Sequence, residues 1–362
     1  MPTIADRVRS LIEQRDQTQS AFAAEIGLDP TKLSKSLSGI RRFASLDLAL
    51  IAETCGVTVD WLLTGEEAPV ALAARAAAGS PAGDALSLAR HYGTLRSDLT
   101  WLGYPQGWRL PEAPSLGGLW KTQGAELAAR ASTKIDEVGD IVGEPLADLV
   151  ERAFGIDVAV QPLGDGIDGL AAATPEMKLI LVAPSAVPAR QRFTIAHELG
   201  HLLASDDQQI HTDTDIYRTD RVESEIRANA FAAHLLMPTQ RLRSTVRAGF
   251  DRHAFCDMAT RWRVSPSSLA IRLEDLRLID AGVAASYRGI TAAQASREVS
   301  QPALVAGLAG ESMALRPPGL LLRDALAAYE RGQASLRLYA SLLGVSTNEL
   351  RAEWEAEGAF EA

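Results

Sequence analysis

The sequence predicts a mostly helical protein with one small β-sheet, which is an α+β fold. Apolar residues recur at helical spacing through most of the chain, whereas residues 157–183 contain short alternating or branched apolar runs. Hydrophobic residues make up 47% of the 362 residues, enough for two or three packed cores. We expect four consecutive parts: a helical domain at 1–66, a linker and aromatic connecting region at 67–118, a domain containing the sheet at 119–280, and a helical module at 281–362.

Composition and charge exclude several protein classes. The net charge of -10 argues against nucleic-acid binding by the whole surface but leaves room for one local basic patch. The first residues lack an apolar signal core, and no run of about 18 apolar residues occurs, so we expect a cytoplasmic protein that does not enter a membrane. Cys55 and Cys256 lie far apart in half-apolar helical settings, which predicts reduced thiols in the core.

Residues 19–39 have the spacing of two short helices around a tight turn. Gly27 permits the left-handed backbone that such a turn needs, and Ile26, Leu33 and Leu37 supply apolar residues between the helices. This pattern predicts a helix-turn-helix. The alternative is a small helical domain with a solvated, charged face.

The second helix of this pair turns its polar residues outward, where a recognition helix meets the DNA major groove. These residues are Thr31, Lys32, Ser34 and Lys35. Arg41 and Arg42 follow and suit the phosphates beside the groove, whereas Asp29 would repel phosphate unless it caps the helix. Residues 7–65 resemble the phage-repressor-like, XRE-type helix-turn-helix family. The resemblance implies a five-helix domain, a double-stranded DNA operator as partner, and a homodimer on palindromic sites.

Residues 193–201, FTIAHELGH, place two imidazoles and a carboxylate on one helical turn. His197 and His201 are four residues apart, so their rings share one face of a helix and can hold one zinc ion. Glu198, beside them, is suited to accept a proton from a zinc-activated water. The apolar pattern predicts a helix from Pro188 to about Ala204.

A zinc site of this kind needs a third protein ligand. We favour Glu225, which opens an amphipathic helix over residues 225–238, because small alanines on that helix would allow close packing on the metal helix. Asp207 is the second choice. His234, on the same helix, either orients a catalytic group or is a satisfied, half-buried histidine.

A short sheet is expected before the metal helix, with strands near residues 157–163, 169–174 and 179–183. In zinc peptidases, a strand edge beside the metal holds an extended substrate by backbone hydrogen bonds. The candidate edge is Leu179, Ile180, Leu181 and Val182. The alternative for these residues is an ordinary buried strand.

Several segments in order resemble the ImmA/IrrE family of metallopeptidases, over residues 143–279. The matching segments are 145–155, RQRFTIAHELGHLL at 190–203, and ExxANxFAxxLLMP at 225–238. The resemblance implies that His197, His201 and Glu225 bind zinc and that Glu198 is the general base. It also implies cleavage of an XRE-type repressor protein in a response to DNA damage or other stress.

Two functions from different classes follow. In the first, a DNA-binding zinc endopeptidase cleaves a repressor, which is either a separate protein or the chain itself. In the second, the chain is a transcription factor whose peptidase-like domain only senses a signal or holds partners. The acidic residues between Asp206 and Glu225 predict either a solvated loop or one that selects a basic, extended peptide.

Overall fold

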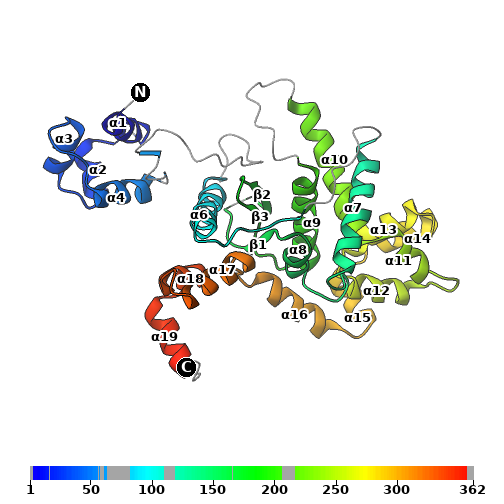
Figure 1. Cartoon of the computed structure of the whole chain (residues 1–362). Helices are drawn as coiled ribbons and strands as arrows, with labels where there is room; N and C mark the ends of the chain where they lie inside the picture. Colours follow the sequence, from blue (N-terminus) through cyan, green and yellow to red (C-terminus); the bar gives the residue numbers. More distant parts are fainter. Residues whose placement is uncertain are drawn as a thin grey trace. The chain divides into compact units, whose positions relative to one another are not determined.

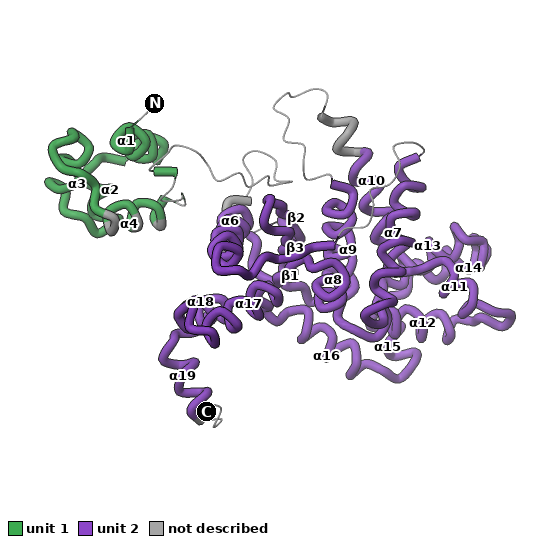
Figure 2. Tube along the Cα trace, viewed as in Figure 1, with its two compact units in different colours: residues 1–70 green, residues 71–362 purple. Residues whose placement is uncertain are grey.

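The computed structural model describes residues 3–15, 17–55, 57, 61–62, 82–109, 119–164, 166–205 and 217–356. The chain divides into two compact units, Met1–Val70 and Ala71–Ala362 (Figure 2). The described residues are mostly helical and contain one three-stranded sheet, as the sequence predicts (Figure 1). None of the helices in these residues combines the length and apolarity needed to cross a lipid bilayer.

The first unit is helical in its described residues. Its helices are α1 (Ile4–Gln14), α2 (Gln19–Glu25), α3 (Pro30–Leu37) and α4 (Ser45–Cys55). Phe22, Leu33 and Ile51 are fully buried and form the centre of its core. Gly27 has a φ of 68°, so the turn between α2 and α3 uses the left-handed backbone expected of glycine at this position. Most of the fifth helix expected from the XRE-type resemblance lies outside the described residues.

The second unit contains the sheet and the other described helices. In chain order its elements are α6 (Ala82–Trp101), α7 (Trp120–Asp136), α8 (Leu146–Phe154), β1 (Asp157–Val160), β2 (Gly169–Ala173), β3 (Lys178–Val182), α9 (Pro188–Ala204), α10 (Tyr217–Leu236), α11 (Thr239–Thr245), α12 (Arg252–Arg261), α13 (Pro266–Asp275), α14 (Ala281–Arg288), α15 (Ala292–Glu298), α16 (Pro302–Met313), α17 (Gly319–Glu330), α18 (Leu336–Leu343) and α19 (Thr347–Ala356). The bounds of α9 match the helix predicted from Pro188 to about Ala204.

The sheet has the strand order β1-β3-β2. Strand β3 runs parallel to β1 and antiparallel to β2, and all of its side chains are buried. Its alternate residues face two cores: Ile180 and Val182 pack toward the layer that contains α8 and α9, whereas Leu179 and Leu181 pack toward α6 and α17. Figure 1 shows the sheet between these helices. The apolar run of β3 therefore reflects burial on both faces.

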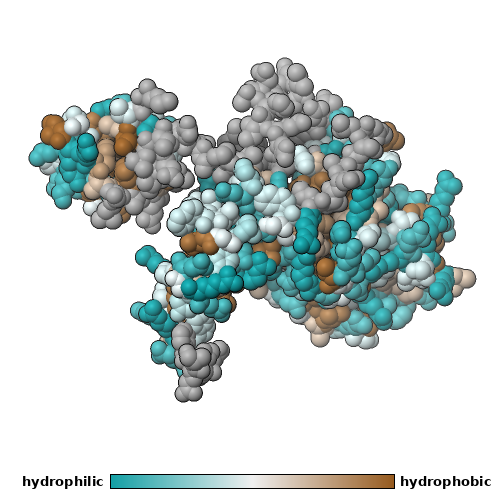
Figure 3. Space-filling model, viewed as in Figure 1, coloured by the Kyte–Doolittle hydropathy of each residue, from teal (hydrophilic) through white to brown (hydrophobic). Residues whose placement is uncertain are grey.

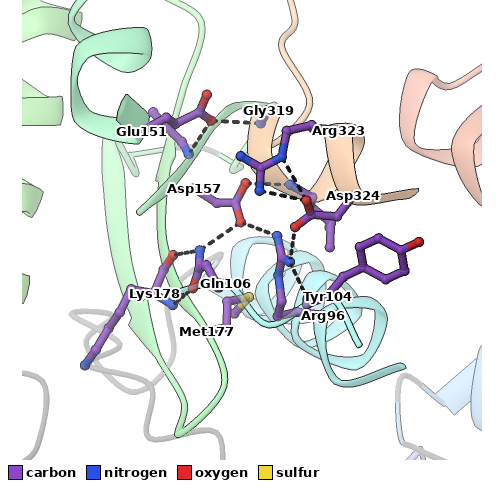
Figure 4. Close-up of polar contacts among 12 residues, drawn as sticks. Arg96, Tyr104, Gln106, Glu151, Asp157, Met177, Lys178, Gly319, Arg323 and Asp324 are labelled. Carbon is purple, nitrogen blue, oxygen red and sulfur yellow. Dashed lines mark hydrogen bonds and ion pairs between the residues drawn. The ribbon is translucent and has the colours of Figure 1, made fainter. Parts of the chain in front are cut away.

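A buried ion network ties α6 and α17 to the sheet (Figure 4). The guanidinium of Arg96, which is fully buried, donates to Asp157 on β1 at 3.0 Å and to Asp324 on α17 at 2.7 Å. The Gln106 side chain donates to Asp157 and bonds both backbone groups of Lys178 at the start of β3. Burial raises the pKa of Asp157 to about 6, so this carboxyl is still ionised at neutral pH opposite Arg96.

The C-terminal segment also contacts the sheet through Arg316. Its backbone pairs with Val160 through hydrogen bonds of 2.9 and 3.0 Å, which adds a bridge to the outer side of β1. Its guanidinium bonds the carboxylates of Glu151 and Asp148 on α8. Contacts therefore cross the boundaries expected at residues 118 and 280, because α6 and α17 pack on the same small sheet.

Most large apolar side chains are inside the two units. Figure 3 shows a largely hydrophilic face with hydrophobic residues in scattered patches. This distribution is the usual one for a folded chain in water.

We predict that Arg96→Met destabilises the second unit by about 3–5 kcal/mol, because two buried carboxylates lose their shared counterion. Arg323→Ala is the matched control: Arg323 also contacts Asp324, but its side chain is 63% exposed, so its loss should cost less than about 1 kcal/mol. Urea unfolding followed by tryptophan fluorescence measures both variants. Equal losses would show that the buried network does not stabilise the unit.

Candidate metal centre

Helix α9 places His197 and His201 side by side. Their Nε2 atoms lie 3.1 Å apart, one helical turn from each other. His201 is 2% exposed and the side chain of His197 is 14% exposed. Both rings are therefore largely shielded from solvent, but the pair is still accessible through His197. Pro188 begins the helix at a position that needs no backbone donor, and Ser205 ends it with a left-handed backbone.

Helix α10 brings a carboxylate to the same point. The Glu225 Oε2 atom lies 3.2 Å from His197 Nε2, and one ligand atom from each of His197, His201 and Glu225 lies within 4.8 Å of the others. In a tetrahedral zinc site with bonds of about 2.0–2.1 Å, neighbouring ligand atoms are roughly 3.3 Å apart. The three side chains therefore fit one metal ion.

Asn229 fixes the orientation of one candidate metal ligand, His197. Its Oδ1 atom lies 3.2 Å from His197 Nδ1, and an amide oxygen only accepts, so Nδ1 carries the proton and Nε2 keeps its lone pair for a metal. Sequence reasoning did not assign this role. The signal was present, because Asn229 follows Glu225 by one helical turn and shares its face of α10.

Glycines allow the metal helix to approach its neighbours. A Cβ atom on Gly200 of α9 would lie 2.9 Å from the ring of Phe231 on α10, so a larger residue would separate the two helices. Gly124 on α7 has the same effect, since its Cβ would lie 2.4 Å from the backbone oxygen of Arg227. From the sequence, we expected alanines to allow the close packing of α10 on α9. The tightest contacts are instead at these glycines.

Glu198 points toward the first residue of β2. It is 5% exposed, and a Cβ atom on Gly169 would lie 3.2 Å from Glu198 Oε1 and 2.4 Å from Thr194 Cγ2. The carboxylate is therefore close to the backbone of β2 and, on its own helix, to the candidate ligands His197 and His201. This is the position that a proton acceptor needs if a substrate lies along that strand.

The expectation that Leu179, Ile180, Leu181 and Val182 form the edge strand was wrong. These residues belong to β3, which is the central strand and pairs with β1 on one side and β2 on the other. Its backbone groups are used by both neighbours, so it cannot add a substrate strand. The local apolar pattern of a strand does not reveal its place in the sheet.

The edge nearest the metal is β2. Ala183 N donates to Asp168 O at 2.9 Å, and Thr174 and Met177 exchange two backbone hydrogen bonds, so the even-numbered positions of β2 face β3. The backbone groups of Gly169, Ala171 and Ala173 therefore face the opposite side, where no strand pairs with them among the described residues. Gly169 puts this edge directly beside Glu198.

Comparison with known proteins finds a family that is similar to the segment that holds this site. Residues 151–274 match the family described as IrrE N-terminal-like domain, Peptidase_M78. The central domain is IrrE-like. The proposed ligands and Glu198 all lie inside the matched range, and the match supports a metallopeptidase domain that binds a metal ion.

Two curated relatives carry the name radiation response metalloprotease IrrE. The protein of Deinococcus radiodurans is 35% identical over 144 residues, which are 38% of this chain and 42% of the relative. The protein of Deinococcus deserti is 36% identical over 137 residues, which are 37% of this chain and 48% of the relative. The chain thus spans less than half the length of each of these relatives, and the similarity concerns one segment of it.

Other residues near the IrrE-like site have structural roles or are not described. His234 Nε2 contacts Arg272 Nη1 at 2.9 Å, and burial, with the Arg272 charge, lowers the pKa of His234 to about 4. It is thus a neutral, satisfied histidine at pH 7. Asp207, the alternative ligand, lies outside the described residues. The acidic segment is not one loop, because α10 begins at Tyr217 and includes its last acidic residues.

The first unit presents the four polar residues expected to meet DNA. Thr31, Lys32, Ser34 and Lys35 are exposed on α3. Asp29 caps this helix through a 3.0 Å bond from Lys32 N, and that backbone bond is the main cause of its lowered pKa. Arg42 is exposed, whereas Arg41 pairs with Asp47 at 2.6 Å and is partly committed to the fold. DNA contact by these side chains remains a prediction.

The expectation of reduced cysteines is consistent with the structure. Cys55 is half-buried, Cys256 is buried, and both are free thiols. Burial is the main cause of the raised pKa of each, so both are mainly protonated at neutral pH.

We predict that Glu225→Ala lowers zinc affinity by at least about a hundredfold, while Asn229→Ala lowers it by about ten- to a hundredfold, as loss of a ligand-orienting partner does. Glu223→Ala, on the same helix but outside the three-residue cluster, is the control and should keep the zinc. Metal analysis after dialysis against a graded chelator measures the three variants. Full occupancy in Glu225→Ala would identify another ligand, with Asp207 the first to examine.

Proposed function

We propose that the chain is a DNA-binding transcriptional regulator whose IrrE-like domain is a zinc-dependent endopeptidase that cleaves a repressor protein. The observation that carries this proposal is the convergence of His197, His201 and Glu225, with Glu198 on the same helical turn and next to a strand edge. A metal-binding scaffold alone would need the three ligands. It would have no use for a buried carboxylate between the metal and a strand edge.

The residues of the site support peptide hydrolysis. A zinc ion held by His197, His201 and Glu225 supplies the Lewis acidity that makes water a nucleophile near neutral pH. Glu198 takes the proton of the attacking water on a carboxylate oxygen and delivers it to the amine nitrogen as the peptide C–N bond breaks. The outward-facing backbone groups of Gly169 and Ala171 hold the peptide as an added strand, which places its carbonyl beside Glu198.

The substrate we propose is an XRE-type repressor, either a separate protein or the chain itself. The first unit supports the DNA-binding part, because two short helices, α2 and the capped α3, follow each other across a turn at Gly27, as a helix-turn-helix requires. We propose a palindromic double-stranded DNA operator and a homodimer as its partners. The names of the Deinococcus relatives refer to a radiation response, and we propose a stress response for this chain.

The proteolytic function is tested with the zinc-loaded full chain and a set of XRE-type repressors, including a second, tagged copy of the chain. We predict cleavage at one bond of at least one of these proteins, and a loss of at least about a hundredfold in rate for Glu198→Gln. Intact-mass analysis of the products identifies the bond. The variant should keep its zinc, which separates loss of the base from loss of the metal.

Cleavage at the same rate by Glu198→Gln would contradict the proposed role of this residue. No cleavage of any tested protein, with zinc bound and DNA binding intact, would favour the alternative in which the domain senses a signal or holds partners.

The DNA-binding function is tested by selecting DNA from a random library with the full chain. We predict one enriched palindromic sequence. Lys32→Ala should weaken binding to that sequence more than binding to random DNA, whereas Arg42→Ala should weaken both about equally and reduce the salt slope by about 1. If Lys32→Ala and Lys35→Ala both leave the preference unchanged, α3 is not the recognition helix.

A further inference from the structure

A polar cavity of about 230 Å³ is lined on one side by Thr194, which precedes Glu198 on α9 by one helical turn. Its walls come from the residue before β2, the loop after β3 and the first turns of α9. The polar side chains that line it are Asp168, Ser185, Arg190, Gln191 and Thr194. The peptidase mechanism described above uses none of these five side chains.

Two contacts place the cavity beside the peptide-binding edge. Thr194 precedes Glu198 by one helical turn, so both side chains lie on one face of α9, and both closely approach Gly169. Asp168 is the neighbour of Gly169 in the chain, and its backbone oxygen continues the pairing of β2 with β3. If a peptide is added to the outer edge of β2 at Gly169, one of its side chains can therefore reach the mouth of the cavity.

The hydrogen bonds within the cavity leave mainly acceptors for a ligand. The amide nitrogen of Gln191 donates to Ala183 O at 3.2 Å and to Ser312 O at 2.7 Å, and the Thr194 hydroxyl donates to Arg190 O. Within the described part of the chain, Gln191 Oε1 and Asp168 Oδ1 accept no hydrogen bond, and Thr194 Oγ1 can accept one more. These oxygens suit a side chain with several N–H donors.

Among the described residues that line the cavity, Arg190 is the cationic one, and its partner Asp168 holds it only loosely. Arg190 Nη2 contacts Asp168 Oδ2 at 2.5 Å, but the two side chains are 64% and 56% exposed. Exposed ion pairs contribute little to stability, so a substrate cation can compete with Arg190 for Asp168. An acidic side chain could pair with Arg190, but it would also meet the Asp168 carboxylate and uncharged acceptor oxygens.

We propose that this cavity is a specificity pocket of the peptidase site that takes an arginine or lysine side chain of the substrate. This inference rests on the proposed endopeptidase function. Asp168 is the charge partner of the bound side chain, Gln191 and Thr194 accept its further hydrogen bonds, and Arg190 competes with it. The pocket thereby selects the position of the cleaved bond relative to a basic residue.

The test is a library of internally quenched peptides in which one position at a time varies among arginine, alanine, leucine and glutamate. With the zinc-loaded full chain, we expect arginine to be preferred at one position near the cleaved bond. The quantity compared is the ratio of kcat/KM for arginine over alanine at that position. Asp168→Asn should lower this ratio by about fivefold, and Arg190→Gln should raise it by about threefold, because the internal competitor is removed.

Glu176→Gln is the matched control. Glu176 is an exposed acidic residue in the turn at the far end of β2, so it changes the charge of the same hairpin without touching the cavity. Its ratio should equal that of the unaltered chain. The proposal would be overturned if, relative to the unaltered chain, Arg190→Gln lowered the arginine-over-alanine ratio or Asp168→Asn raised it. It would also be overturned if Glu176→Gln lowered the ratio as much as Asp168→Asn does.

A binding measurement separates failure of the pocket from failure of the proposed function. The zinc-loaded Glu198→Gln chain is titrated with fluorescent peptides that differ only in the varied residue. Tighter binding of the arginine peptide that is lost with Asp168→Asn would support the pocket even if no peptide is cleaved. Equal binding of the arginine, alanine and glutamate peptides would overturn the proposed pocket. Cleavage with no preference for any residue at any position would also overturn the pocket, but it would leave the proposed peptidase function intact.

Discussion

The geometry of the candidate metal site depends on three close contacts of α9 and α10, each made possible by the absence of a side chain. Gly200 lets α9 approach Phe231 on α10, Gly124 lets α7 approach the backbone of α10, and Gly169 lets β2 approach Glu198. Because two of the proposed ligands come from α9 and the third from α10, the separation of these helices sets the distance between imidazole and carboxylate. If a side chain at one of these glycines moved the helices apart by a few tenths of an ångström, the three ligand atoms would leave the nearly tetrahedral geometry that zinc requires.

The parts of the second unit that carry no metal ligand determine which strand edge is open. Arg96 joins α6, β1 and α17 through buried carboxylates, and Arg316 pairs with the outer side of β1. Within the described residues, β2 is left with the unpaired edge, and that edge lies next to Glu198. The C-terminal helices are thus part of the same compact unit as the His197, His201 and Glu225 cluster.

Local patterns predicted the elements well, but they did not predict contacts between elements. The HExxH segment and its apolar face predicted α9 with its correct bounds, and the amphipathic segment after Glu225 predicted the helix that supplies the third cluster residue. The strand order was missed because a strand buried on both faces has the same composition wherever it pairs. Asn229 and Gly169 act through neighbours distant in the sequence, so their roles became visible only with the packing.

The central claim is that His197, His201 and Glu225 bind one zinc ion, and X-ray absorption at the zinc edge tests it most directly. Zinc-loaded full chain should show two imidazole nitrogens and carboxylate oxygen at about 2.0–2.2 Å, with no sulfur in the first coordination shell. His201→Ala should remove one imidazole from the spectrum or abolish zinc binding. A spectrum with sulfur ligands near 2.3 Å, or one unchanged by His201→Ala, would contradict the account.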